Sequence, residues 1–427
     1  MRKRTAIPLL TALFLGLITL LFWKSPPISS TTSPSDSPPA LEPPAVPAPR
    51  LSDLAPPPDW SELDAWQEKI TRREFIEMMD SVFTVSPAWR EWFVVGTDQV
   101  EVKTAEAEAP YVLRFSKAPD TSGPRYWRSA GELPAAPAGR PLEGLRIAID
   151  PGHIGGKWAK IEERWFQVGD GKPVREGSMT LEVAKMLKPM LESLGADVTL
   201  VRTANEPVTN YRPESLMSEA LDRSIDSPRK LAERLFYRTA EIRARGDKVN
   251  HEIKPDLVLC LHFNAEGWGD PLLPRLVTNN HFHLILNGAY MDGEVTLEDQ
   301  RFEIMRKIVE RIHPEEAALA TSMAAAFVEK TQLPPYLYEP NSRRAVNIDN
   351  NPYLWARNLL ANRLYRCPVV FLEPYVMNSE EVHARVQLGD YEGLREVAGK
   401  PRPSIFKEYA ESVTKGLSDY YQAQRAD

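Results

Sequence analysis

Three apolar segments of this sequence each end in a side chain that can bind a metal ion or transfer a proton. Residues 147–152 (IAIDPG) lead into His153, residues 257–261 (LVLCL) lead into His262, and residues 369–372 (VVFL) lead into Glu373. Short apolar runs of this kind are typical of buried strands. Because open α/β sheets bind ligands outside the carboxyl ends of their strands, we expect these side chains to share one site.

Two histidines and one carboxylate are a common ligand set for a catalytic zinc ion, and they leave one coordination position for water. The ion lowers the pKa of that water and polarises the scissile carbonyl, and a further carboxylate can then transfer protons. His153 and His262 supply the two imidazoles, and Glu373 supplies the proton-transfer group. The residues alone leave the third ligand open among four intervening glutamates, which are Glu162, Glu163, Glu176 and Glu182.

The elements that must position these side chains point to an α/β fold. A main domain begins at residue 142. Residues 178–194 have apolar side chains at helical spacing, Gly195 is a natural C-terminal stop, and residues 197–201 form the next expected strand. This βαβ unit predicts a three-layer αβα domain with a mostly parallel twisted sheet. Further elements are expected at 213–245 (helical), 281–286 (strand), 315–330 (helix), 369–373 (strand) and 404–423 (helix).

The first 141 residues divide into three parts. Residues 6–23 carry no charge and follow a basic start, so residues 1–24 are expected to be an uncleaved signal anchor, or alternatively a cleaved signal peptide. Residues 25–59 contain twelve prolines and are expected to be a Pro/Ser-rich linker. Residues 60–141 predict a small α+β domain of unknown role. The chain is therefore expected on the periplasmic side of a cell envelope, held at the inner membrane by residues 6–23, or secreted after cleavage.

The composition argues against a nucleic-acid partner. The net charge is −7 over 427 residues, and no basic stripe with interleaved aromatic residues occurs. The two cysteines, Cys260 and Cys367, both lie beside expected buried strands. Two buried free thiols are the favoured interpretation, although a disulfide between them stays open.

Several motifs, taken in order, resemble the zinc-dependent N-acetylmuramoyl-L-alanine amidases of the type-3 amidase domain. The matching stretches lie within residues 143–420 and are IAIDPGHIGG (147–156), EGSMTLEVA (176–184), LVRT (200–203), LCLHFNA (259–265) and CPVVFLEPYVMNSEE (367–381).

The resemblance implies one Zn²⁺ per chain, held by His153, Glu176 and His262, with Glu373 as the catalytic glutamate. It selects Glu176 because the family's ligand lies five positions ahead of a core leucine, here Leu181. It also implies hydrolysis of the amide bond between N-acetylmuramic acid and L-alanine, with peptidoglycan as substrate and an activator protein as a further partner to consider.

The chain departs from the family pattern at three places. Ile154 stands where the family usually has glycine directly after the first histidine. The loop from His153 to Glu176 and the segment from Arg202 to His262 are both longer than usual, and the second of these contains the possible lid. Its residues 211–245 are expected to form either a lid over the site or a surface elaboration. These departures keep two other functions open: a non-catalytic or partner-gated peptidoglycan-binding protein, and a zinc peptidase that acts on stem peptides.

Other residues are weaker candidates. His281 and His283 are spaced to share one face of a strand and could form a second metal site or contact substrate. Asp150 could orient His153 or cap the turn after its strand. Asn264 matches the family's HxN segment and could contact either substrate or the loop backbone. Arg343 and Arg344 could bind stem-peptide carboxylates.

Overall fold

The computed structural model describes residues 50–105, 108–223, 226–339 and 342–425. The predicted anchor at 6–23 and most of the predicted linker lie outside these residues. No helix in the described ranges combines the length and the apolar character needed to span a bilayer.

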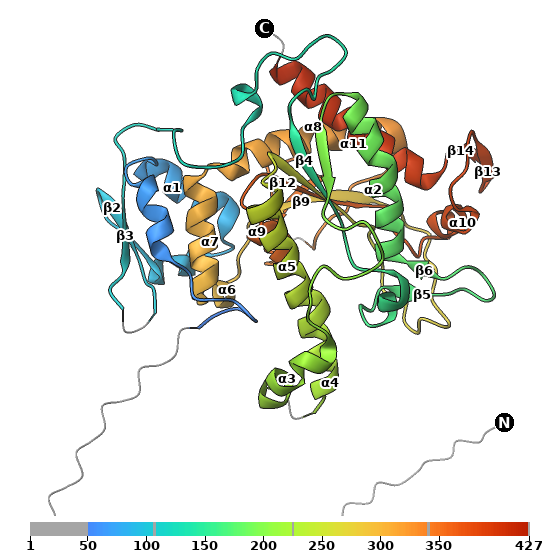
Figure 1. Cartoon of the computed structure of the whole chain (residues 1–427), viewed down its shortest axis with the longest axis horizontal. Coiled ribbons are helices and arrows are strands. Elements are labelled where there is room, and N and C mark those ends of the chain that lie inside the picture. Colours follow the sequence, from blue (N-terminus) through green and yellow to red (C-terminus); the bar gives the residue numbers. More distant parts are fainter. Residues whose placement is uncertain (1–49, 106–107, 224–225, 340–341, 426–427) are drawn as a thin grey trace, which may run out of the picture. The chain divides into compact units, whose positions relative to one another are not determined.

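A seven-stranded mixed sheet forms the centre of the described chain (Figure 1). From one edge to the other its strands are β10 (Val346–Asn347), β11 (Leu354–Arg357), β9 (Phe282–Asn287), β12 (Val369–Pro374), β8 (Leu257–Leu261), β4 (Arg146–Pro151) and β7 (Asp197–Leu200). The block β12–β8–β4–β7 is parallel throughout. Strand β9 is antiparallel to β12, and β11 is parallel to β9. The mostly parallel α/β sheet is therefore confirmed.

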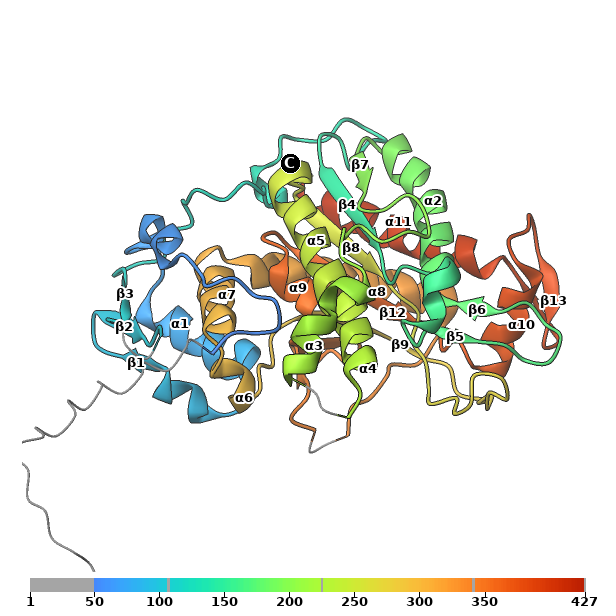
Figure 2. The same cartoon turned by 60° about the horizontal axis from the view of Figure 1, so that its bottom comes forward.

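The alternation of side chains along the strands assigns the helices to two faces of the sheet. Ile147 and Ile149 of β4 pack in one apolar cluster with helices α2 (Glu176–Ser193), α8 (Ile312–Thr331) and α11 (Ile405–Gln424). Ala148, between them, packs in a second cluster with residues of the opposite face, where α5 (Glu241–Asp247), η8 (Lys248–Ile253) and α9 (Leu360–Leu364) lie. Figure 2 shows α5 and α9 in front of the strands and α11 behind them.

Residues 60–141 contain a three-stranded antiparallel sheet, β1 (Phe93–Val95), β2 (Gln99–Val102) and β3 (Tyr111–Arg114). Beside it lie the 3₁₀ turn η1 (Trp60–Trp66), helix α1 (Arg72–Met78) and the π-helical turn η2 (Met79–Phe83). Its apolar residues belong to the same continuous core as the main sheet, because Phe75 and Trp89 join the cluster that contains Ile147. The separate domain stays a prediction.

Residues 211–223 and 226–245 form a helical insertion made of η6 (Pro213–Leu216), α3 (Met217–Arg223), α4 (Pro228–Arg234), η7 (Leu235–Ala240) and the start of α5. Its apolar side chains, among them Leu216 and Phe236, form a cluster with Ile154, and Trp158 packs against that cluster. The isoleucine that departs from the family pattern is therefore the point at which the loop after His153 packs on this insertion.

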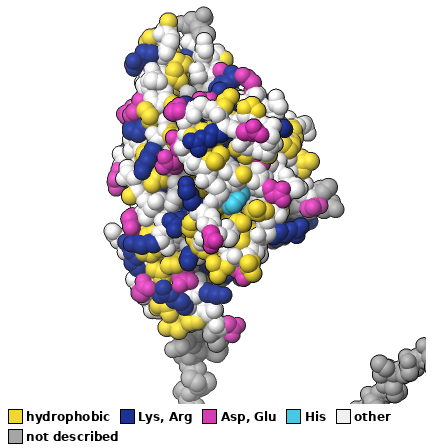
Figure 3. Space-filling view, turned by 90° about the vertical axis from the view of Figure 1, so that its right-hand side faces the viewer, with side chains coloured by type: hydrophobic (Ala, Val, Ile, Leu, Met, Phe, Trp, Pro, Cys, Tyr) yellow, Lys and Arg dark blue, Asp and Glu magenta, His cyan; other side chains and the backbone are white. Residues whose placement is uncertain are grey.

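The other helices of the described ranges are α6 (Asp292–Val295) and α7 (Glu298–Val309), which pack on each other, and α10 (Glu380–Leu388), which packs on α11. Short hairpins pair β5 (Trp165–Phe166) with β6 (Val174–Arg175) and β13 (Arg395–Val397) with β14 (Lys400–Arg402). On the face shown in Figure 3, positive, negative and apolar side chains are intermixed. An anionic ligand on this face would therefore meet individual cations rather than a uniformly basic surface.

Candidate metal centre

The two histidines emerge side by side because their strands are parallel neighbours. Strand β4 ends at Pro151 and β8 ends at Leu261, and these two residues are register partners. The chain continues through Gly152, whose N–H donates to Leu261 O at 2.8 Å, into His153. His153 has a left-handed backbone conformation with φ at 58°, which is uncommon for a residue with a side chain. A methyl group on Gly152 would lie 2.2 Å from the His262 ring, so only glycine fits between the two histidines.

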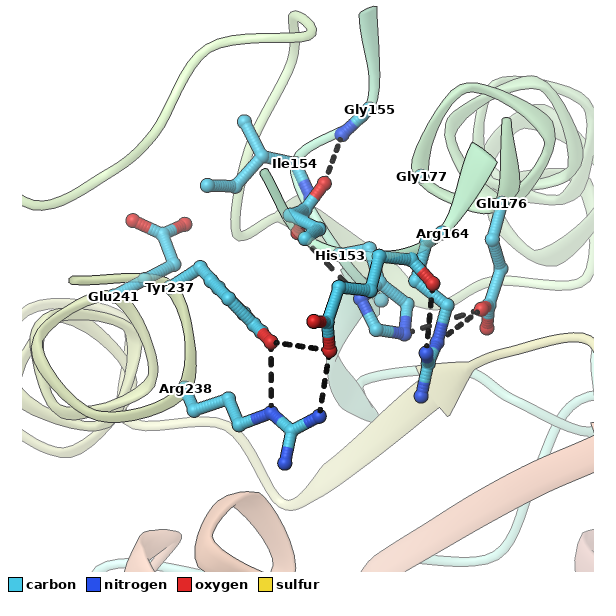
Figure 4. A network of polar contacts seen from close by, with 12 residues as sticks. His153, Ile154, Gly155, Arg164, Glu176, Gly177, Tyr237, Arg238 and Glu241 are labelled. Carbon is cyan, nitrogen blue, oxygen red and sulfur yellow. Dashed lines mark hydrogen bonds and ion pairs between the residues drawn. The ribbon is translucent and has the colours of Figure 1, made fainter. Parts of the chain in front are cut away.

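Helix α2 brings the third group, because its first residue is Glu176. His153 Nε2 lies 3.2 Å from Glu176 Oε2, and His262 Nδ1 lies 3.0 Å from Glu176 Oε1. One donor atom from each residue lies within 4.8 Å of the others, and no other such group occurs in the described ranges. The His262 ring stacks on Phe371 at a centroid distance of 4.2 Å, which fixes the ring plane. Figure 4 shows His153 and Glu176 converging from the strand end and the helix start.

A second carboxylate holds the other side of the His153 ring. Glu162 is 1% exposed, and its Oε1 lies 3.5 Å from His153 Nδ1. The same carboxylate accepts the backbone N–H groups of Ile154 at 2.7 Å and Gly155 at 2.9 Å. Histidines that bind metals usually donate their second ring N–H to a carboxylate or carbonyl in this way. Because Glu162 lies beside Nδ1, the other ring nitrogen of His153, Nε2, faces Glu176.

Glu373 shares a cleft with the three residues. It is the next to last residue of β12, which is parallel to β8, so its side chain reaches the same edge of the sheet. The cleft holds about 430 Å³. It is lined by His153, Arg164, Glu176, His262, Phe263, Asn264, Ala265, Glu266, Gly267, Trp268 and Glu373.

The charges of His153, Glu176 and Glu373 act strongly on one another. Burial raises the pKa of Glu176, but the adjacent His153 and His262 outweigh this effect and hold the pKa well below its usual range. Burial lowers the pKa of His153, but Glu176 and Glu162 outweigh this effect and raise the pKa to about 9. Burial and the charge of Glu176 raise the pKa of Glu373 to about 8. A buried carboxylate beside imidazoles, with a second carboxylate nearby, is a set of groups that a divalent cation would stabilise.

Comparisons with solved structures return peptidoglycan amidases at low similarity. The N-acetylmuramyl-L-alanine amidase Ami1 from Mycobacterium abscessus is 15% identical with a TM-score of 0.37, covering 65% of this chain and 99% of that one. The CwlD amidase from Clostridioides difficile, solved in complex with the GerS lipoprotein, is 12% identical with a TM-score of 0.37, covering 66% and 100%. The amidase AmiC2 of Nostoc punctiforme is 16% identical with a TM-score of 0.33, covering 66% and 99%.

No family model and no curated protein matches the chain. The functional argument therefore rests on the side chains of the site.

Of the residues that the sequence offered as weaker candidates, Asn264 lines the cleft. Its amide nitrogen lies 3.4 Å from His283 Nδ1, and His283 Nε2 lies 3.2 Å from the Tyr338 hydroxyl. Burial lowers the pKa of His283 to about 3, so its ring is neutral. His281 Nε2 lies 3.3 Å from Glu266. Neither His281 nor His283 belongs to the metal group, so among the described residues they form no second metal site.

The remaining candidates lie elsewhere. Asp150 is buried beneath the site, where it accepts Arg245 Nη1 at 2.8 Å and the Tyr365 hydroxyl at 2.5 Å. The residue against the His153 ring is Glu162, not Asp150. The side chain of Arg343 is 73% exposed, and it lines a separate cavity beside Asp80. Neither Arg343 nor Arg344 is among the residues that line the cleft.

The insertion flanks the site. None of its described residues, 211–223 and 226–245, lines the cleft. Instead, Arg245 Nη2 donates to His153 O at 2.8 Å, and the Tyr237 hydroxyl donates to Glu163 Oε2 at 3.3 Å. The insertion thus fixes the backbone of the loop that follows His153.

Proposed function

We propose that this protein hydrolyses the amide bond between N-acetylmuramic acid and L-alanine in peptidoglycan, with zinc as the metal. The observation that carries the proposal is the convergence of His153, Glu176 and His262, with donor atoms within 4.8 Å, in one cleft with Glu373. The ordered motifs that resemble type-3 amidases supply the substrate class.

The donor set fits zinc. Two imidazole nitrogens and one carboxylate oxygen are the ligands of many hydrolytic zinc sites, although other divalent ions can occupy the same donors. Glu176 is 2% exposed, so its charge requires compensation at the site. A zinc ion held there would polarise the scissile carbonyl and make a water molecule more acidic.

The chain's own side chains perform the proton transfers. Glu373 lines the cleft beside the metal group. A cation bound there would favour its ionised form, which would take a proton from the attacking water. It would then return this proton to the departing L-alanine nitrogen, so that a glycan strand and a free stem peptide result. Glu162 holds the His153 ring, and Phe371 holds the His262 ring, so both imidazoles stay in place during turnover.

We also propose that the enzyme works at the cell envelope. Residues 6–23 are long and apolar enough for a signal anchor, and the Pro-rich residues 25–59 would carry the catalytic part to the wall. An activator protein remains part of this proposal because the described insertion forms a helical surface beside the site.

The test combines full-length protein, purified in mild detergent, with isolated peptidoglycan. Mass spectrometry should find stem peptides with a free L-alanine amine, and a chelator should abolish their release until zinc is restored. Glu373→Gln should lower the rate at least about 100-fold, the usual minimum contribution of general acid–base catalysis, while bound zinc and Tm stay unchanged. Glu380→Gln is the control, since it removes an exposed carboxylate from α10.

Different products would support different functions. Cleavage within the stem peptide would identify a zinc peptidase instead of an amidase. Binding to peptidoglycan with stoichiometric zinc but without any cleavage would favour a non-catalytic or partner-gated wall-binding protein.

A further inference from the structure

Arg164 is the single arginine or lysine among the described residues that line the cleft. It lies directly before β5, at the end of the loop that begins at His153. The other charged groups of the cleft wall are the histidines and the carboxylates of Glu176, Glu266 and Glu373. Apart from the proposed metal centre, Arg164 is therefore the place on the cleft wall that attracts an anionic part of a substrate, whereas the carboxylates repel it.

The guanidinium of Arg164 is held on two sides. Its Nε lies 3.2 Å from Glu176 Oε2, and its Nη1 donates to Glu163 O at 3.0 Å. Figure 4 shows the side chain extended beside Glu176. No acceptor among the described residues takes Nη2, and the side chain is 35% exposed. Donors are therefore left for a ligand in the cleft.

The insertion sets the position of this guanidinium. Glu163 has a left-handed backbone, with φ at 57°, and it is the residue whose carbonyl meets Arg164. Its carboxylate accepts the Tyr237 hydroxyl at 3.3 Å and lies 3.6 Å from Arg238 Nη2. Arg238 Nε also donates to the Tyr237 hydroxyl at 3.0 Å. Since Tyr237 packs in the cluster with Ile154, the insertion and the loop form one support for Arg164.

We propose that Arg164 binds a carboxylate of the peptide part of the substrate. It thereby determines on which side of the cleft the peptide lies. The inference rests on the proposed function and names a binding residue for it. In a muramoyl-peptide the lactyl carboxyl group is the scissile amide, so free carboxylates occur only on the peptide. Arginine matches a carboxylate with its planar fork of donors, and a guanidinium held in place loses little conformational entropy on binding. Tyr237 and Glu163 act as positioning residues.

The test compares two synthetic substrates with the full-length, zinc-loaded protein. One is a muramoyl-peptide with free carboxylates, and the other is the same compound with every carboxyl group amidated. The ratio of kcat/KM for acid over amide should fall about tenfold in Arg164→Gln, the size expected for one charge-assisted hydrogen bond. Arg164→Lys should retain part of the ratio, because it keeps the charge but loses the fork. Tyr237→Phe should lower the ratio two- to threefold, on the order of a weaker neutral hydrogen bond.

Lys160→Gln is the matched control. Lys160 lies on the same loop, where its ammonium lies 4.4 Å from the Trp165 ring centroid, but it does not line the cleft. Its substitution should leave the acid-to-amide ratio at the wild-type value. A ratio that falls as far in Lys160→Gln as in Arg164→Gln would overturn the proposal, because the effect would then be one of overall charge.

Two further measurements separate this proposal from other roles of Arg164. Zinc content and zinc affinity should be the same in wild type and Arg164→Gln; loss of zinc in step with activity would show that Arg164 acts through Glu176 and would overturn the proposal. Calorimetric binding of the free stem peptide, as acid and as amide, requires no turnover. If wild type cleaves neither substrate, the proposed function fails, and the binding ratio alone decides the role of Arg164. Equal binding of acid and amide to wild type would overturn it.

Discussion

The ring of His153 and the carboxylate of Glu162 lie 3.5 Å apart, from Nδ1 to Oε1, on the side of the ring that faces away from Glu176. Glu162 also accepts two backbone N–H groups of the loop after His153. One buried carboxylate therefore fixes both the ring and the turn that delivers it. This relationship explains how a histidine in a left-handed conformation keeps a single orientation at the site.

The first prediction concerns this carboxylate. Glu162→Gln keeps the shape of the side chain but removes the charge that holds Nδ1–H, so zinc should bind about 10–100-fold more weakly. Competition with a chelating dye measures the affinity without any need for activity. Glu163→Gln, at the next position, removes an exposed carboxylate and is the control for zinc binding. An unchanged zinc affinity in Glu162→Gln would remove Glu162 from the site.

A second prediction follows from the space between the two histidines. A methyl group at position 152 would lie 2.2–2.6 Å from three atoms of the His262 ring, so Gly152→Ala should displace this ring and lose stoichiometric zinc. The backbone at Gly152 does not lie in the left-handed region, so the effect is steric rather than conformational. Gly267→Ala is the control in the same cleft, because no atom lies within 4 Å of its added methyl group. The zinc content of both purified variants tests this prediction. A full equivalent of zinc in Gly152→Ala would contradict it.

The sequence predicted which side chains converge at this edge of the sheet better than it predicted their surroundings. Apolar runs before His153, His262 and Glu373 identified three strand ends, since buried parallel strands contain little else. Spacing alone could not choose between Glu176 and Glu162 as the third metal ligand, because both follow His153. Only the fold shows that Glu176 starts α2 and faces the two histidines, whereas Glu162 supports the His153 ring. Arg164 carried no signal, since its place in the cleft depends on the loop conformation.

Two parts of the fold that sequence patterns missed have separate physical causes. Helix α7 buries charged side chains, among them Arg301 and Lys307, whose hydrogen bonds to backbone carbonyls replace apolar contacts. An apolar periodicity is therefore weak in this helix. The antiparallel direction of β9 was likewise hidden, because a buried strand has the same composition in either direction.

A third prediction concerns stability and pH at a site far from the metal group. Glu316 is 1% exposed; burial raises its pKa from 4.5 to about 7, and the opposing effect of Lys307, 3.8 Å away, is smaller. Between these two values the folded protein binds more protons than the unfolded chain, so this group lowers the free energy of unfolding as pH rises from 4.5 to 7. Glu316→Gln removes the titration but keeps an acceptor for Val369 N. The stability of the variant relative to wild type should therefore rise across this window, by on the order of 1–3 kcal/mol from below pH 4.5 to above pH 7. Urea unfolding at several pH values measures the difference, and a constant difference would contradict the prediction.

The fourth prediction concerns the charges beneath the site. Arg245 is 3% exposed and binds Asp150 at 2.8 Å, Glu241 at 2.7 Å and His153 O at 2.8 Å. Arg245→Met would leave two buried carboxylates without their shared cation, and loss of one partner from a buried ion pair costs about 3–5 kcal/mol. Because the same guanidinium holds the backbone of His153, zinc affinity should fall together with stability. Arg229→Met is the matched control in the same insertion, since its side chain is 50% exposed and pairs with Glu214, and exposed pairs contribute about 0–1 kcal/mol. Equal unfolding free energies for the two variants would mean that the insertion does not depend on this buried network.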